Sequence, residues 1–418
     1  YEADPDQTLR HRHFLTSRIK KGSSPTLDRV PLLFNQDIAM LYVEPTDNDT
    51  HFYRNAQGDE LVYVSKGTGT LETVFGDLPY GPGDYLVIHR GILHRWRLDL
   101  SGEQTKLLVM ESRGHVRTPK RYRNEFGQLI EGAPYSERDI RRPSALSAHD
   151  ERGDFPILIK QYDGLNEIVL DHHPFDVVGW DGYFYPWAFN IRDFEPIVGR
   201  VHQPPPVHQT FQGDGFVVCS FCPRPYDFDP EALPAPYNHS NVDSDEVLYY
   251  ASSEFMSRKG IEFGSITHHP DGIPHGPHPG RAEASIGAKY TDELAVMRGD
   301  SADVFQKPVS PPLPLGASPR FPRGVFVGLA GGLGVVHLPP VQGPPRRPEY
   351  REPSAYASIR EPINRIRRTG EGDLWLNTYN AFTIQLVAAS GEKESIRNLY
   401  RALGFLRQFP VFCDPLRQ

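Results

Sequence analysis

The sequence predicts a mainly β protein with two barrel or jelly-roll modules, a proline- and glycine-rich linker and a small helical C-terminal segment. The 418 residues include 40 prolines and 37 glycines, which favours short strands and turns over long helices. Short alternating apolar runs separated by turn residues point the same way. The predicted boundaries are 1–165 (first module with a bridging region), 166–300 (second module), 301–348 (linker) and 349–418 (helical segment).

The first module is predicted from a series of short strands and tight turns. Residues 59–65 alternate between apolar and polar, 66–69 form a turn, and 70–75 alternate again. A further turn and strand occupy 80–88. Hairpins repeated at this spacing are typical of a sandwich or a small barrel.

This stretch resembles a cupin, whose second motif is a turn, a strand and a histidine a few residues later. Here the turn is Gly81-Pro-Gly-Asp84 and the histidine is His94. The first cupin motif normally supplies two histidines and a glutamate. This chain has Glu60, and the nearest preceding histidine is His51. We therefore expect a structural first module without a metal.

The second module contains the most informative residues of the chain. His239, Glu246 and His275 offer two imidazoles and one carboxylate on neighbouring strands and turns. Three such ligands on one face of an ion leave the opposite face free for substrate and O₂, which suits non-haem Fe(II). The sequence therefore predicts an Fe(II) site in this module.

Composition excludes several other classes of function. A formal net charge of -8 argues against a nucleic-acid-binding protein, and no apolar run reaches the ~18–20 residues of a membrane span. With three cysteines and no recognisable signal peptide, a cytoplasmic location is expected. Cys219 and Cys222 lie in an apparent strand, where positions three apart face opposite sides, so they are not expected to share a zinc ion.

The last third of the chain changes character. Residues 308–348 are rich in proline, and the glycines of 324–336 lack the lysine and hydroxyl residue of a phosphate-binding loop. Residues 375–387 return to a helical period. We expect a linker followed by a helical segment of unknown role.

From about residue 30 to 297 the chain resembles the homogentisate 1,2-dioxygenase family. The matching anchors follow one another in the family's order: Phe52–Glu60, Ile88–Gly91, Val177–Trp180, Phe216–Arg224, Pro236–His239 and Pro274–Pro277. The resemblance implies an Fe(II) enzyme with a two-cupin core. Such an enzyme opens homogentisate with O₂ to maleylacetoacetate in tyrosine and phenylalanine breakdown. It also implies that the chain assembles as trimers or hexamers.

Carried over to this chain, the family's iron ligands become His239, Glu246 and His275. A further family histidine acts on the substrate hydroxyl. Its best match is His202, with His208 as the competitor.

Three assignments around the ligands stay open. Asp245 competes with Glu246, which we favour because it opens the apolar strand 247–250 while Asp245 faces away across the pleat. His269, six residues before His275 in a turn-rich segment, either lines the substrate pocket or is a plain loop residue. His278 is left out of the site.

Two alternatives accompany the leading hypothesis. The same ligands suit a dioxygenase of another dihydroxylated aromatic acid, such as gentisate. The chain also departs from the family after residue 297, so a non-catalytic cupin scaffold that binds a ligand is the alternative from a different class.

Overall fold

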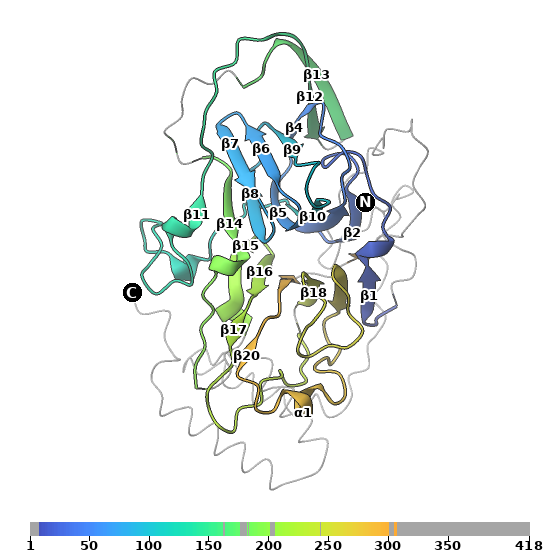
Figure 1. Ribbon diagram of the computed structural model, residues 1–418, viewed down its shortest axis with the longest axis vertical. Coiled ribbons are helices and arrows are strands. Elements are labelled where there is room, and N and C mark those ends of the chain that lie inside the picture. Colours follow the sequence, from blue (N-terminus) through green and yellow to red (C-terminus); the bar gives the residue numbers. More distant parts are fainter. Residues whose placement is uncertain are drawn as a thin grey trace, which may run out of the picture. The chain divides into compact units, whose positions relative to one another are not determined.

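Strands dominate the described part of the computed structural model (Figure 1). The structure describes residues 8–161, 164–175, 182, 184–200, 205–242, 244–300 and 305–306. The chain divides into two units, 1–336 and 337–418, and every described residue belongs to the first. The predicted helical segment and nearly all of the predicted linker therefore lie outside the described residues.

Two sheets form the N-terminal module. The inner sheet has eight strands in the order β11 (Ile140–Arg141), β14 (Trp187–Asn190), β8 (Asp84–Ile88), β5 (Asp59–Lys66), β10 (Lys106–Ser112), β3 (Ile38–Val43), β2 (Val30–Phe34) and β22 (Phe305–Gln306). The outer sheet has six in the order β13 (Gly164–His172), β12 (Arg152–Gln161), β4 (Phe52–Asn55), β9 (His94–Leu98), β6 (Gly69–Thr73) and β7 (Gly76–Tyr80). Val62 and Val64 of β5 pack with Leu71 and Trp96 between the two sheets.

A third sheet of six strands forms the C-terminal module. Its order is β1 (Arg12–Leu15), β19 (Ser265–His269), β18 (Asp245–Tyr250), β21 (Ala295–Asp300), β16 (Phe216–Phe221) and β15 (Gln209–Gly213). A two-stranded ribbon and short helices complete the described elements: β17 (Arg224–Pro225), β20 (Tyr290–Thr291), α1 (Arg281–Ser285), η1 (Thr16–Arg18), η2 (Lys120–Tyr122), η3 (Glu137–Asp139), η4 (Ile191–Asp193) and η5 (Pro205–His208).

The inner sheet and the C-terminal sheet pack face to face. Tyr63 of β5 and Tyr249 of β18 meet in this shared core with ring centroids 6.1 Å apart, and the Tyr249 hydroxyl donates to Ser65 Oγ at 2.7 Å. Because side chains alternate along a strand, Leu248 and Tyr250 face the other way, into the C-terminal module's own core. Glu246 shares that second face.

The two modules exchange strands at their ends. β1 pairs with β19, joining residues about 250 positions apart, and β14 pairs with β8 of the inner sheet. Figure 1 shows β1 beside the C-terminal module. The N-terminal segment therefore borders the sheet that carries the candidate ligands.

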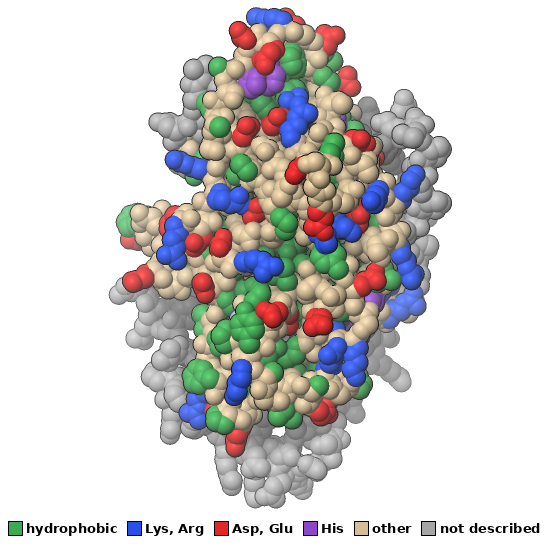
Figure 2. Space-filling view, viewed as in Figure 1, with side chains coloured by type: hydrophobic (Ala, Val, Ile, Leu, Met, Phe, Trp, Pro, Cys, Tyr) green, Lys and Arg blue, Asp and Glu red, His purple; other side chains and the backbone are tan. Residues whose placement is uncertain are grey.

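Several sequence predictions can now be assessed. The predicted mainly β fold is confirmed: strands arranged in sheets dominate the described residues. Cys219 and Cys222 pack in different cores on opposite sides of the C-terminal sheet, as the alternation predicted. Acidic and basic side chains are interspersed on the face seen in Figure 2. No helix among the described residues is long and apolar enough to cross a membrane.

Candidate metal centre

Two short backbone contacts bring the candidate histidines together. His239 and His275 form an isolated antiparallel bridge, in which each backbone N–H donates to the other's carbonyl, at 2.8 and 2.7 Å. The two rings lie 4.4 Å apart. The neighbouring strand β18 supplies Glu246 as its second residue, on the face turned toward this bridge.

The three predicted ligands converge. One ligand atom from each of His239, Glu246 and His275 lies within 4.8 Å of the other two. His275 Nε2 is 3.0 Å from Glu246 Oε2, and His239 Nε2 is 3.7 Å from Oε1. The side chain of His275 is 2% exposed and that of His239 19%, so the group is open on the His239 side.

Hydrogen bonds fix which ring nitrogens face the group. His239 Nδ1 lies 3.1 Å from the Tyr237 carbonyl, and His275 Nδ1 lies 3.0 Å from the Ile273 carbonyl. A carbonyl only accepts, so each Nδ1 donates its proton there and each ring turns its Nε2 toward Glu246. Loss of the Nε2 protons would leave two lone pairs facing the carboxylate. In that state the two imidazoles and the carboxylate form a donor set for a cation.

Burial and charge act in opposite directions on these groups. Burial disfavours the Glu246 carboxylate, but contacts with His239, His269 and His275 hold its pKa well below the usual range. Burial likewise disfavours a charged His239, but Glu246 and the Tyr237 carbonyl raise its pKa. The carboxylate is thus ionised at neutral pH, as a metal ligand must be.

Asp245, the competing carboxylate, faces the other way. Its Oδ2 lies 2.8 Å from His268 Nε2, and its Oδ1 accepts the Asp271 backbone N–H at 2.8 Å. It lies on the same strand face as Val247 and Tyr249. The geometry agrees with the alternation argument, which favoured Glu246.

Two other groups of potential ligands occur among the described residues, and both are hydrogen-bond networks. Asp59 accepts from His89 Nδ1 at 2.8 Å, from the Arg90 and Val116 backbone N–H groups, and from His115 at 3.0 Å. These four contacts occupy the carboxylate.

The second group is His149, Glu151 and His173. The two imidazoles stack 3.7 Å apart with planes only 11° from parallel, so their in-plane lone pairs cannot meet. His173 Nδ1 also accepts the Phe175 backbone N–H at 3.2 Å. In all three groups the potential ligand atoms lie within 4.8 Å of one another. The Glu246 group differs in that a backbone carbonyl holds the Nδ1 of both histidines, so that both Nε2 atoms face the carboxylate.

His269 lies at the end of β19, paired with Glu246, and is buried at 3% exposure. It is therefore a strand residue and not a loop residue. Arg258 donates to its Nε2 at 3.0 Å and to the Gly276 carbonyl at 3.0 Å. The proton then sits on His269 Nδ1, which is 3.7 Å from Glu246 Oε2. Burial lowers the pKa of His269 to about 4.

Among the described residues, the remaining histidines considered in the sequence analysis are not found in the Glu246 group. His202 lies outside the described residues. His208 is buried and packs its ring 4.9 Å from Phe221, on the C-terminal module's own core. His278 accepts the Lys259 backbone N–H at 3.1 Å. His278 is thus held by a neighbouring loop, apart from the Glu246 group.

Sequence reasoning missed two residues of this region. Arg258 lies in a polar loop with no motif of its own. His11, just before β1, places its ring 5.5 Å from His269 and 6.1 Å from His275. Only the long-range pairing of β1 with β19 brings His11 here, and no local pattern signals that pairing.

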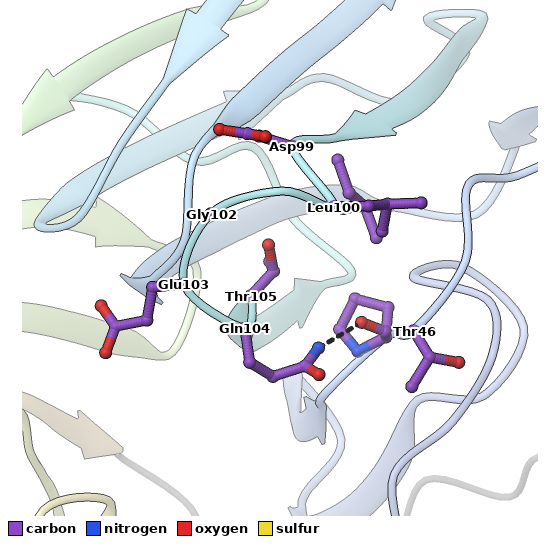
Figure 3. Close-up of a pocket in the computed structure, with 9 residues that line it drawn as sticks. Thr46, Asp99, Leu100, Gly102, Glu103, Gln104 and Thr105 are labelled. Carbon is purple, nitrogen blue, oxygen red and sulfur yellow. Dashed lines mark hydrogen bonds between the residues drawn. The ribbon is translucent and has the colours of Figure 1, made fainter.

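A surface hollow of about 170 Å³ lies elsewhere (Figure 3). Thr46, Asp99, Glu103 and Gln104 are among its lining residues, and the Gln104 side chain donates to the Pro45 carbonyl. No histidine or cysteine lines it, so it offers no soft metal donor.

Comparison with known proteins identifies relatives of this chain. A family model described as the homogentisate 1,2-dioxygenase N-terminal region matches residues 33–191. The "Putative dioxygenase" of Saccharolobus solfataricus is 44% identical over 295 residues, which cover 70% of this chain and 76% of that protein. Homogentisate 1,2-dioxygenase of Bradyrhizobium diazoefficiens is 25% identical over 238 residues, which cover 55% of this chain and 51% of the enzyme.

Among solved structures, a cupin 2 conserved barrel protein from Leptotrichia buccalis aligns with 71% of this chain and 96% of its own length. The TM-score is 0.31 and the sequence identity 10%.

Proposed function

Because this chain belongs to the homogentisate 1,2-dioxygenase family, we propose that it is an Fe(II)-dependent dioxygenase that cleaves the ring of homogentisate to give maleylacetoacetate. The match spans only about half of the Bradyrhizobium enzyme, 51% of its length. The substrate is therefore proposed from the family resemblance and the metal from the site.

One observation supports the proposal most strongly: the Nε2 atoms of two histidines, each with its Nδ1 held by a backbone carbonyl, converge with one carboxylate oxygen within 4.8 Å. Two histidines and one carboxylate with open positions are the donor set of non-haem Fe(II) oxygenases. We propose His239, Glu246 and His275 as the three ligands. When bound, Fe(II) would polarise a phenolic substrate oxygen and bring the substrate together with O₂.

The surrounding residues orient the ligands. The Tyr237 and Ile273 carbonyls hold the two imidazoles in the tautomer that a metal requires. Arg258 fixes the proton of His269 on Nδ1, facing Glu246 Oε2. This N–H points toward Oε2 from 3.7 Å, and Oε1 faces His239. We propose that the N–H favours the ionised carboxylate by its charge distribution, without a direct hydrogen bond.

Proton transfer at the substrate hydroxyl needs a further group. We propose His202 for this role from the family resemblance, with His208 as the competitor. His269 is proposed to support Glu246 rather than to bind the substrate through Nε2, because Arg258 occupies that nitrogen.

The test is O₂ uptake by the chain loaded anaerobically with Fe(II), using homogentisate, gentisate and a monohydroxylated control acid. One mole of O₂ should be consumed per mole of homogentisate, and the ultraviolet absorbance of maleylacetoacetate should appear. O₂ uptake with gentisate but not with homogentisate would show that gentisate is the substrate. Bound iron without uptake on any dihydroxylated acid would favour the non-catalytic scaffold. Light scattering on the same sample would test the predicted trimer or hexamer.

A further inference from the structure

The two modules share one local arrangement of backbone and side chains, which we call the frame. Asn55-x3-Asp59-Glu60-x2-Tyr63 has its counterpart in Asn241-x3-Asp245-Glu246-x2-Tyr249. Gly91-Ile-Leu-His94 likewise corresponds to Gly272-Ile-Pro-His275. The repeat extends from sequence to backbone contacts, as the hydrogen bonds of the two segments show.

Two pairs of equivalent hydrogen bonds establish the correspondence. The N–H of Gly91 donates to the Asn55 carbonyl at 2.8 Å, and that of Gly272 to the Asn241 carbonyl at 2.6 Å. The N–H of Arg90 donates to Asp59 Oδ1 at 2.8 Å, and that of Asp271 to Asp245 Oδ1, also at 2.8 Å.

Strand register then pairs the side chains of the two centres. Tyr53 pairs with His94 as His239 pairs with His275. Glu60 pairs with Ile88 as Glu246 pairs with His269. Tyr53 therefore stands at the position of His239, and Glu60 and His94 stand at those of Glu246 and His275.

His94 keeps the conformation of a metal ligand. Its Nδ1 lies 3.0 Å from the Ile92 carbonyl, as His275 Nδ1 does from that of Ile273. The Nε2 atom therefore carries a lone pair. It is fully buried and has no hydrogen-bond partner among the described residues.

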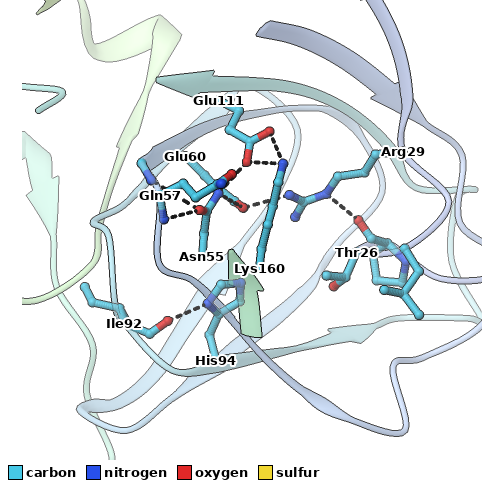
Figure 4. Close-up of polar contacts among 12 residues, drawn as sticks. Thr26, Arg29, Asn55, Gln57, Glu60, Ile92, His94, Glu111 and Lys160 are labelled. Atoms are coloured by element: carbon cyan, nitrogen blue, oxygen red, sulfur yellow. Dashed lines mark hydrogen bonds and ion pairs between the residues drawn. The ribbon is translucent and has the colours of Figure 1, made fainter. Parts of the chain in front are cut away.

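A guanidinium group supplies the positive charge at this centre (Figure 4). Arg29 Nη1 lies 2.8 Å from Glu60 Oε2, and neither side chain is more than 6% exposed. The Arg29 guanidinium also lies 5.7 Å from the centroid of the Tyr53 ring. Burial opposes a charged Arg29, but Glu60 raises its pKa above the usual range.

We propose that the N-terminal module contains a second cation site, built on the same frame as the Glu246 group, in which the guanidinium of Arg29 takes the place of a divalent metal ion. Two substitutions separate this site from a metal site: Tyr53 in place of a histidine, and Arg29 as the resident cation. Glu60 and His94 already present a carboxylate oxygen and an imidazole lone pair.

The test restores the missing ligand and removes the resident cation. In the Arg29→Ala/Tyr53→His variant, equilibrium dialysis against Co²⁺ at pH 7.5 should find one more bound equivalent per chain than in the parent. Adding Glu60→Gln provides the matched control, because it deletes the carboxylate charge with little change of shape. This triple variant should return to the parent value.

A stability measurement covers the case in which the double variant folds poorly. Without metal it leaves Glu60 buried and unpaired, so its Tm should fall and should recover when Co²⁺ is added. Addition of Co²⁺ should change the Tm of the triple variant no more than it changes the Tm of the parent. If the double variant folds only when Co²⁺ is present, the gain is recorded after refolding with Co²⁺.

The proposal is overturned if the double variant binds no more Co²⁺ than the parent, or if the triple variant gains as much. Because each value is compared with the parent, a parent that binds no metal at the Glu246 group would refute the proposed function without deciding this inference.

Discussion

The centres of the two modules share a frame and differ in what neutralises the carboxylate. In the N-terminal module Arg29 lies 2.8 Å from Glu60. In the C-terminal module Glu246 faces the Nε2 atoms of two imidazoles, which we propose as ligands of an added cation. At the position equivalent to His239 the N-terminal module has Tyr53, which offers no imidazole ligand. Arg29 supplies a permanent positive charge there instead. If the proposed metal site is correct, the same arrangement of strands and side chains holds an internal ion pair in one module and a metal ion in the other.

The largest effect is expected when the ion pair between Arg29 and Glu60 is broken. Glu60→Gln leaves the buried Arg29 charge without its main partner, which typically costs about 3–5 kcal/mol of folding free energy. Urea unfolding of the metal-free protein measures it. The exposed Lys66–Glu103 pair is the control, since Glu103→Gln should cost at most about 1 kcal/mol. An equally small loss for Glu60→Gln would show that Arg29 is not a buried counter-charge.

Glu246→Gln should abolish metal binding, because it removes the charged ligand. Removal of a ligand should weaken Fe(II) binding more than about 100-fold, beyond the usual effect of an outer contact. Metal analysis after anaerobic dialysis measures it. Asp245→Asn is the neighbouring control and should keep its iron, because Asp245 faces His268. Iron loss in the control with retention in Glu246→Gln would reverse the ligand assignment.

Arg258→Met tests the outer contact of the C-terminal centre. Without the guanidinium, His269 is free to place its proton on either nitrogen, and support of Glu246 weakens. We expect about a 10- to 100-fold lower Fe(II) affinity, measured by competition with a chelator. Lysine at this position should recover part of the affinity because it still donates to His269 Nε2. An unchanged Fe(II) affinity in the methionine variant would show that Arg258 contributes only to packing.

The smallest effect concerns Asp59, the neighbour of Glu60. Burial disfavours its charge, but hydrogen bonds from His115 and His89 lower its pKa. A lowered folded-state pKa gives stability that is present above the unfolded value of about 3.9 and is lost as the pH falls below it. Asp59→Asn should cost about 1 kcal/mol at pH 7 and flatten acid unfolding below about pH 4. Denaturation at several pH values measures both, and an unchanged acid limb would contradict the assignment.

Much of the fold and part of the site follow from local patterns in the sequence. Alternation along 245–250 separates Glu246 from Asp245, and the geometry agrees. The hairpins of the first module are visible as alternating runs between turns. The repeat of Asn, Asp-Glu and Tyr in both modules was also available in the sequence as a sign of the shared frame.

Long-range packing explains what the sequence did not reveal. Arg29 reaches Glu60 from a segment without a recognisable motif. His11 reaches the C-terminal centre only through the pairing of β1 with β19. His269 lies among turn residues, but pairing with β18 makes it the end of a strand. None of these contacts has a local signature, because each depends on how distant strands are brought together.

The most direct test is anomalous diffraction at the iron edge from crystals loaded with Fe(II). We expect a peak about 2 Å from His239 Nε2, His275 Nε2 and a Glu246 oxygen, and none beside Arg29. A peak at the His149 or Asp59 groups, with none at Glu246, would contradict it.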